Sequence, residues 1–351
     1  MSVHWRGAAL VAALAAGSSC AAGRAVGAPP EQFEYLEHPP RAPAGPVILV
    51  TIDGARWQEI FEGSDPEHSS GPWARQTPRD LVPNLDRLVR ERGAAVGAPS
   101  RGVIRATGPN FVSLPGYTEI LTGRAPITCQ DNTCATIAVP TLLDESRAAG
   151  KSVAAFGSWE MLDRAVSSRP GSFLVSCGRS GDTHIDPWPG SGDFRPDRLT
   201  AAKALEHLEK AQPDLLYVGL GEPDEYGHHD DYAGYLRALT YADSVIGKLL
   251  AVLDHMGSRG RQTHLFVTAD HGRARDFKGH GGFAPESARV WLVASGPSIT
   301  ARGRVVSSRE RHLADVAPTL RTVLGLAPDR ITDRAEGWPG VPLVELFAAQ
   351  L

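Results

Sequence analysis

The sequence carries no excess of basic residues. Lys and Arg together number 36, Asp and Glu number 40, and the net charge of the 351-residue chain is −4. A protein that holds nucleic acid neutralises rows of phosphates with Lys and Arg side chains. We therefore expect no nucleic-acid scaffold role.

The sequence also lacks internal repeats of fixed period, and its composition is 42% hydrophobic and 22% charged. These values are ordinary for globular proteins and exclude a disordered or fibrous chain. Residues 23–45 are rich in proline and show little apolar periodicity, which is typical of an extended spacer. We expect one domain over residues 46–351.

Apolar runs long enough to cross a membrane are missing. The one long apolar stretch, residues 8–16, follows Arg6 and precedes small residues that end at Ala22. A membrane-spanning helix needs about 20 apolar residues, whereas this pattern is typical of a secretory signal. We expect residues 1–22 to be a signal peptide that directs the protein to the periplasm, the outside of the cell or a lipid anchor on Cys20. Membrane contact is expected only if Cys20 is lipidated.

Cysteine is scarce, with four residues in the chain. Because Cys20 belongs to the signal region, three cysteines remain for the domain. Cys129 and Cys134 are close enough in sequence to pair in an oxidising compartment. Cys177 would then be free or buried, and its pairing with one of the other two stays open.

The body of the sequence does contain short apolar runs that alternate with helical patterns. Apolar spacings of one, three and four predict a helix over Tyr235–Leu253 that Gly257 can end, and a second helix is expected around Thr200–Lys210. This alternation predicts an α/β fold, with a mostly parallel central sheet and helices on both faces. The runs typical of strands buried on both faces are Val47–Val50, Leu215–Val218, Leu265–Thr268 and Val290–Val293.

Carboxylate and imidazole groups follow three of these predicted strands. Parallel strands end at the same edge of a sheet, where ligands bind. Carboxylates that converge there repel one another unless a divalent cation lies between them. Aspartate oxygen together with histidine nitrogen favours zinc, because calcium and magnesium prefer all-oxygen ligand sets. The candidate ligands lie at Asp53, in the segment Glu222–His228, at Asp270–His271 and at His280.

A hydroxyl group stands at the start of another predicted helix. Ser113 begins the stretch Ser113–Gly123. The N-terminus of a helix favours an anionic substrate and lowers the pKa of a serine hydroxyl. Ser113 is therefore either a nucleophile or a helix cap.

Together these motifs resemble the alkaline phosphatase superfamily, and most of all its nucleotide pyrophosphatase/phosphodiesterase branch. The resemblance extends from Val47 to Leu326. The motifs that carry it are Val50–Gly54, Thr77–Pro78, Pro83–Leu88, Ser113–Gly123, Glu222–His228, Thr268–Gly272 and Asp315–Leu320.

The resemblance implies an alkaline phosphatase-like catalytic domain with two zinc ions per chain. Ser113 would attack phosphorus, because a serine hydroxyl becomes a good nucleophile once a metal stabilises its alkoxide. Water would then cleave the phosphoseryl intermediate. Asn132 lies about where that branch places an asparagine that donates to a phosphoryl oxygen. The implied ligands are Asp224, His228 and His280 for one ion, and Asp53, Asp270, His271 and Ser113 for the other.

The chain departs from that branch at several positions. The branch commonly has a threonine nucleophile followed by Pro-Asn-His, whereas here Ser113 is followed by Pro115–Tyr117. Beside His228, the segment His229–Asp231 offers competing ligands or forms a solvated turn. Three arginines near the motifs are candidate phosphate contacts, with surface exposure as the simpler expectation: Arg56, Arg124 and Arg273.

We expect an exported hydrolase of phosphate esters whose small-molecule substrates are diesters or pyrophosphates. A phosphomonoesterase is the main alternative, and it would need an additional cation for the extra substrate charge. A sulfatase of the superfamily needs arginine where this chain has Tyr117, and a phosphomutase would carry a large inserted domain for which the chain is too short. A non-catalytic zinc-stabilised binding protein is disfavoured, because structural zinc favours cysteine ligands.

Overall fold

The computed structural model describes residues 44–178, 194–327 and 337–347. The expected signal peptide 1–22, with Cys20, and nearly all of the spacer 23–45 lie outside the described residues and stay predictions. Within the described ranges, no helix combines the length and the apolar character that a membrane span requires.

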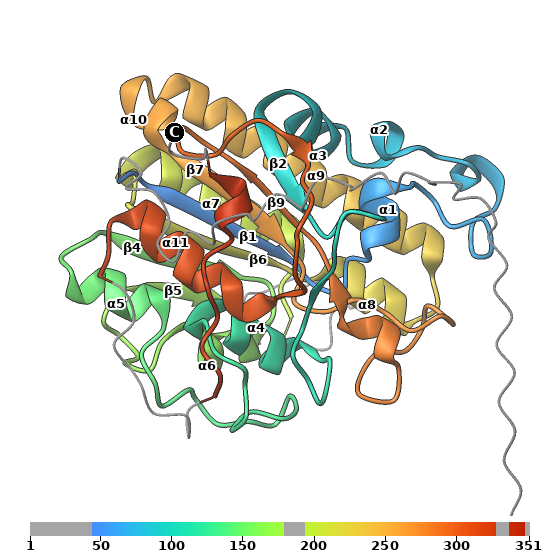
Figure 1. The fold of residues 1–351 in the computed structure, drawn as a ribbon, viewed down its shortest axis with the longest axis horizontal. Coiled ribbons are helices and arrows are strands. Elements are labelled where there is room, and N and C mark those ends of the chain that lie inside the picture. Colours follow the sequence, from blue (N-terminus) through green and yellow to red (C-terminus); the bar gives the residue numbers. More distant parts are fainter. Residues whose placement is uncertain (1–43, 179–193, 328–336, 348–351) are drawn as a thin grey trace, which may run out of the picture. The chain divides into compact units, whose positions relative to one another are not determined.

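The centre of the fold is an eight-stranded sheet in the order β10-β2-β9-β7-β1-β6-β4-β5 (Figure 1). Within this described sheet, only β9 runs antiparallel to its neighbours, β2 and β7, and all other pairs are parallel. The predicted α/β class with a mostly parallel sheet is confirmed. The strands are β1 (Val47–Ile52), β2 (Gly93–Val96), β4 (Val153–Gly157), β5 (Leu174–Cys177), β6 (Leu215–Leu220), β7 (His264–Thr268), β9 (Leu292–Ser295) and β10 (Gly303–Arg304).

Strand β1 lies between β6 and β7, with Val50 opposite Val218 on one side and Val267 on the other. All six residues of β1 are buried. A central strand covered on both faces needs apolar side chains at successive positions, which is why the continuous apolar runs predict these three strands.

One strand prediction was wrong, because the run Val290–Val293 is divided between two sheets. Strand β8 (Arg289–Val290) belongs to a small sheet with β3 (Ile104–Arg105) and β11 (Arg311–His312), whereas β9 belongs to the main sheet. The division falls at Trp291. Its buried indole donates to the carbonyl of Ala55 at 2.9 Å, and its own carbonyl accepts from the hydroxyl of Thr268 at 2.6 Å. These bonds fix Trp291 where the chain passes from one sheet to the other.

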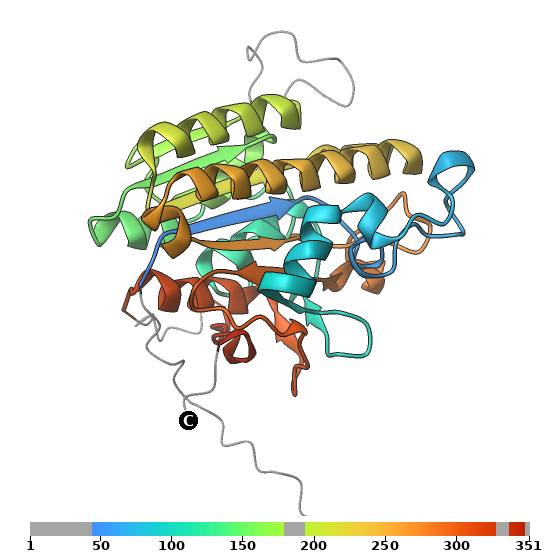
Figure 2. The same ribbon diagram turned by 90° about the horizontal axis from the view of Figure 1, so that it is seen from above.

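Helices cover both faces of the main sheet. Figure 2 shows α7 and α9 on one side and α11 on the other, and α4 packs against α11. Both predicted helices are present, and Gly257, with a φ of 63°, follows the end of α9. The longer helices are α4 (Ser113–Thr122), α7 (Asp197–Ala211), α9 (Tyr232–His255) and α11 (Val316–Leu324).

Short helices fill many of the connections, and α8 follows β6 almost directly. The short α-helices are α1 (Trp57–Phe61), α2 (Pro78–Leu81), α3 (Pro83–Arg87), α5 (Leu142–Ala148), α6 (Asp163–Val166), α8 (Glu222–His228) and α10 (Ser258–Gln262). The other helical turns are η1 (Gly71–Trp73), η2 (Leu88–Arg92), η3 (Glu160–Leu162), η4 (Pro285–Ala288), η5 (Leu313–Asp315) and η7 (Val344–Leu346).

The strand order places three carboxylates at one edge of the sheet. Asp53 directly follows β1, Asp224 lies on α8 after β6, and Asp270 lies two residues after β7. Because β6, β1 and β7 are adjacent and parallel, their carboxyl ends meet at this edge. The topology therefore brings these three side chains together.

Candidate metal centre

Asp53, Asp270 and His271 form the first cluster of metal-ligating groups. One ligand atom of each lies within 4.8 Å of the others. The Nε2 atom of His271 is 3.3 Å from Asp53 Oδ1 and 3.5 Å from Asp270 Oδ2. All three residues are buried, so water can do little to solvate or screen their charges.

The carboxylate of Asp270 is not satisfied within the cluster. Burial, together with the charges of Asp53 and Asp224, raises the pKa of Asp270 well above its usual range. Its Oδ1 accepts from the backbone amide of Gly54 at 3.2 Å, but its Oδ2 has no hydrogen-bond partner among the described residues. A buried polar atom without a partner is costly, and a bound cation would satisfy it.

The imidazole of His271 is oriented as a metal ligand requires. Its Nδ1 donates to the carbonyl of Gly272 at 2.8 Å. This bond fixes the tautomer and leaves the Nε2 lone pair directed at the carboxylates. Burial lowers the pKa of His271, but its side-chain hydrogen bond with Asp53 and the charges of Asp224 and Asp53 outweigh that effect and raise it.

The second cluster contains Asp224, His228 and His280, and its ligand atoms also lie within 4.8 Å of one another. Asp224 and His228 are one turn apart on α8, with His228 Nε2 at 2.9 Å from Asp224 Oδ2. His280 Nδ1 is 3.1 Å from the carbonyl of Phe111, and His280 Nε2 is 3.1 Å from His228 Nε2. When Nδ1 of His280 donates to Phe111, its Nε2 lone pair faces the other imidazole, and a proton or a cation must lie between them.

The two clusters adjoin each other. The rings of His271 and His280 stack with centroids 4.0 Å apart and planes at 17°. Gly54, with a φ of 60°, turns the chain after Asp53, and a Cβ atom there would lie 2.3 Å from Asp224 Oδ1. Asp and His donors without cysteine, next to an unsatisfied carboxylate oxygen, fit a divalent cation at each cluster.

Ser113 lies beside the first cluster. It is the first residue of α4, and its Oγ is 3.4 Å from Asp53 Oδ1 and 3.3 Å from His271 Nε2. The capping position belongs to Val112, whose side chain makes no capping bond. The hydroxyl of Ser113 therefore points to the ligand cluster and does not cap the helix.

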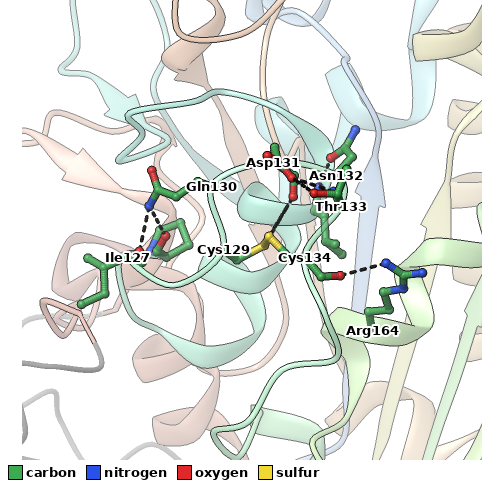
Figure 3. The surroundings of a disulfide bond; sticks show 10 residues. Ile127, Cys129, Gln130, Asp131, Asn132, Thr133, Cys134 and Arg164 are labelled. Carbon is green, nitrogen blue, oxygen red and sulfur yellow. Dashed lines mark hydrogen bonds between the residues drawn. A yellow bond between two sulfur atoms is a disulfide. The ribbon is translucent and has the colours of Figure 1, made fainter.

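A loop closed by a disulfide reaches the same end of α4. Cys129 and Cys134 are bonded, which is one of the pairings that the sequence leaves open, and Cys177 is buried at the end of β5. Asn132 lies between the bonded cysteines (Figure 3), and its Oδ1 accepts from the amide of Leu114 at 2.9 Å. Asn132 therefore caps α4 from a separate loop, next to the predicted nucleophile.

The arginines near the motifs are not at the surface, so that expectation was wrong. Arg56 forms a buried ion pair with Glu59, and Arg124 donates to the carbonyl of Gly337 at 3.4 Å. The guanidinium of Arg273 pairs with Asp224. Each side chain is drawn into the fold by these partners. The residues that are each 3% exposed are Arg56, Arg124 and Arg273.

The segment His229–Asp231 lies between two helices and is in neither ligand cluster. His229 is the residue after α8, and Asp230 is exposed with a φ of 60°. The side chain of Asp231 accepts from the amide of Gly234 at 2.7 Å and so caps α9. Of the two expectations for this segment, the structure has the turn.

Two carboxylates of the candidate clusters have partners that the sequence predictions do not include. The hydroxyl of Tyr117 donates to Asp53 Oδ2 at 2.7 Å, and Arg273 pairs with Asp224 Oδ1. In both cases the second oxygen of the carboxylate faces its cluster. The position of Tyr117 one helical turn after Ser113 is a sequence signal for the first pair, whereas nothing in the sequence indicates the second.

The model of a metalloenzyme superfamily matches residues 193–328. This range contains all of the second cluster and, with Asp270 and His271, two members of the first. This part of the chain thus matches the alkaline phosphatase-like metalloenzyme superfamily. Members of this superfamily are hydrolases or mutases that act on phosphate or sulfate esters.

The curated relatives are much longer than the matched segments. The chain is 29% identical over 175 residues to the 2,3-bisphosphoglycerate-independent phosphoglycerate mutase of Haloarcula marismortui, which covers 48% of this chain and 31% of the mutase. The corresponding enzyme of Natronomonas pharaonis is 34% identical over 134 residues, which cover 37% of this chain and 25% of that enzyme. The chain thus spans less than a third of either mutase.

Solved structures of the superfamily share the fold. A putative sulfatase from Bacteroides thetaiotaomicron has a TM-score of 0.64 at 14% identity, over 86% of this chain and 74% of the sulfatase. Murine ectonucleotide pyrophosphatase/phosphodiesterase 5 has a TM-score of 0.57 at 12% identity, over 87% of this chain and 100% of that structure. At these identities the similarity concerns the fold alone.

Proposed function

We propose that the chain is an exported hydrolase of phosphate esters, above all diesters or pyrophosphates, that uses Ser113 and two zinc ions. The observation that carries the proposal is the position of Ser113 Oγ, 3.4 Å from Asp53 and 3.3 Å from His271. A hydroxyl at a helix start beside two adjoining Asp/His clusters is what an in-line displacement at phosphorus needs.

The proposed ligands divide between two ions. Asp53, Ser113, Asp270 and His271 would hold one, and Asp224, His228 and His280 the other. Bound zinc supplies the Lewis acidity that stabilises the serine alkoxide and the departing oxygen, and it lowers the pKa of water.

Ser113 carries out the displacement in two steps. Its Oγ forms a bond to phosphorus while the bond from phosphorus to the leaving oxygen breaks, and the hydroxyl proton passes to that oxygen through solvent. Water then attacks the phosphoserine, the bond from Oγ to phosphorus breaks, and a proton returns to Ser113. The amides at the start of α4 face the negative charge, and Asn132, which caps this end, is the proposed donor to a phosphoryl oxygen.

The ion pairs that the arginines form within the protein favour diesters over monoesters as substrates. A monoester carries more charge and calls for a further cation at the site. Arg56 and Arg273, two candidates for that role, are committed to Glu59 and Asp224. The phosphomonoesterase stays the alternative, and the relative rates on a diester and a monoester separate the two.

Sulfatase activity and a non-catalytic role are less well supported. Tyr117 stands where a sulfatase motif needs arginine, and its hydroxyl is bonded to Asp53. A binding protein with structural zinc favours cysteine ligands, whereas both clusters consist of Asp and His. The apolar segment near the N-terminus supports export, with a lipid anchor only if Cys20 is modified.

The test compares hydrolysis of bis-p-nitrophenyl phosphate and p-nitrophenyl phosphate by mature protein that has been stripped with chelator and reconstituted with zinc. We expect zinc-dependent turnover with a preference for the diester. Ser113→Ala should abolish turnover and retain zinc, whereas Ser146→Ala, a buried serine on α5, should change neither. Preference for the monoester would favour the phosphatase alternative. Turnover by Ser113→Ala would refute the covalent mechanism.

A further inference from the structure

Tyr117 and Ser113 stand one turn apart on α4 and point to the same carboxylate. The hydroxyl of Tyr117, which is 1% exposed, donates to Asp53 Oδ2 at 2.7 Å. The other oxygen, Asp53 Oδ1, lies 3.4 Å from Ser113 Oγ and 3.3 Å from His271 Nε2. One helix therefore contacts both oxygens of Asp53, one through a tyrosine and the other through the predicted nucleophile.

The backbone of α4 also lies against the second carboxylate of the same cluster. A Cβ atom at Gly116 would stand 2.4 Å from the carbonyl oxygen of Asp270, so only glycine permits this approach. The first turn of α4 is thus held against Asp270 by close packing and tied to Asp53 by a side-chain bond. A displacement of Asp53 relative to Ser113 would have to break the Tyr117 bond.

We propose that Tyr117 is a positioning residue that presents Asp53 to the metal through Oδ1 alone and keeps it in register with Ser113. A donor bonded to one oxygen of a ligating carboxylate fixes the carboxylate's rotation, and such partners commonly set metal affinity and activity. This inference rests on the proposed function for the identity of the metal, but it concerns the geometry of Asp53. It also explains how the chain uses a tyrosine at the position after Gly116, where the phosphodiesterase branch has histidine.

The chain provides a matched control in Tyr217 on β6. Its hydroxyl is bonded to Thr51 Oγ1 at 2.8 Å, and the residue is fully buried. Thr51 lies on β1 and is in neither ligand cluster. Tyr117→Phe and Tyr217→Phe therefore remove the same group from the same core, but only the first removes a bond to a proposed ligand.

The experiment measures zinc affinity by competition with a chromogenic chelator, and kcat and KM for bis-p-nitrophenyl phosphate. For Tyr117→Phe we expect one of the two zinc equivalents to bind about 10- to 100-fold more weakly and kcat at saturating zinc to fall, with KM within about twofold. Tyr217→Phe should keep both zinc affinities. Thermal unfolding of the two variants shows whether each remains folded.

The possible outcomes distinguish this inference from the proposed function. If the wild type binds two zinc ions and Tyr117→Phe binds them as tightly, with kcat unchanged, the role of Tyr117 is refuted and the proposed function stands. If Tyr217→Phe weakens zinc as much as Tyr117→Phe, the effect is one of core packing and the inference is also wrong. If the wild type binds no zinc, the proposed function fails and the inference fails with it. Loss of zinc in Tyr117→Phe alone supports both.

Discussion

Arg273 donates to one oxygen of Asp224, while the other oxygen lies 2.9 Å from His228. Burial acts to raise the pKa of Asp224, but Arg273 and His280 outweigh burial and hold it well below its usual range. A Cβ atom at Gly227 would stand 2.3 Å from the guanidinium carbon of Arg273. Glycine at this position therefore leaves the room that the arginine needs to pack against α8. Arg273 thereby keeps Asp224 ionised, which is the form that binds a metal.

Replacing Arg273 should destabilise the protein in a zinc-dependent way. In metal-free protein, Arg273→Met leaves a buried carboxylate without its partner, which costs about 3–5 kcal/mol in unfolding free energy. Zinc should restore part of this loss because the cation supplies the missing charge. Arg56→Met breaks the buried pair with Glu59, which belongs to neither cluster, and its loss should not depend on zinc. Urea unfolding with zinc and with chelator tests both, and equal losses for Arg273→Met in the two conditions would contradict the prediction.

Removal of the metal should matter more as the pH rises. The folded pKa of metal-free Asp270 lies above its unfolded value of 3.8 because of burial and the neighbouring carboxylates. Its contribution to stability is therefore complete below about pH 3.8 and is lost as the pH rises through the folded pKa. We expect the increase in melting temperature on adding zinc to grow as the pH rises above about 3.8, since zinc binds the ionised form. Metal-free Asp270→Asn should lack this pH-dependent loss, and a zinc effect that is flat with pH would be inconsistent with the argument.

The disulfide should act on catalysis through Asn132. Cys129 and Cys134 close the loop that holds Asn132 against the amide of Leu114, and loss of a helix cap costs about 1 kcal/mol. We expect Asn132→Ala to lower kcat/KM, and the double change of Cys129 and Cys134 to serine to lower it in the same direction. When the two changes are combined, the loss in activation free energy should be less than the sum of the separate losses, because both remove the same contact of Asn132 with Leu114. Cys177→Ser, a buried site outside the loop, is the control, and strict additivity would refute the coupling.

The apolar patterns predict most of the central sheet because they report burial directly. Strands β1, β6 and β7 are continuous apolar runs, and the carboxylates that follow them meet because parallel neighbours end at one edge. The sequence predicts a single strand at Val290–Val293, because an apolar run does not reveal which of two sheets each residue joins. Only the position of Trp291, bonded to Ala55, decides that.

Pairs distant in sequence account for what could not be predicted. The bond from Tyr117 to Asp53 joins residues 64 positions apart, and the pair of Arg273 with Asp224 joins residues 49 apart. Neither separation corresponds to a local period. The spacing of Tyr117 from Ser113 indicates that the two share one side of α4, but nothing in the sequence indicates the partner of Arg273. For this reason the sequence predicts Arg273 at the surface, whereas the structure has it in the core.

Glu119 should make stability depend on pH independently of the metal ligands. It lies on α4, where its carboxylate accepts from the hydroxyl of Thr107, from the amide of Thr107 at 2.8 Å and from the amide of Ala314 at 3.0 Å. Burial exceeds the effect of these bonds and raises the pKa of Glu119 from 4.5 to about 7. Because the folded pKa is the higher one, the stabilisation is complete below about pH 4.5 and is lost as the pH rises through 7.

A shift of this size corresponds to a stability change on the order of 3 kcal/mol. Glu119→Gln removes the titration, so the difference in unfolding free energy between wild type and variant should fall by about that amount from pH 4.5 to 8. Urea unfolding at several pH values measures it, and effects of zinc common to both proteins cancel in the difference. Glu206→Gln, at an exposed position on α7, should give a small and nearly constant difference. A constant difference for Glu119→Gln as well would mean that the carboxylate is ionised throughout, held by Thr107 and Ala314 against the cost of burial.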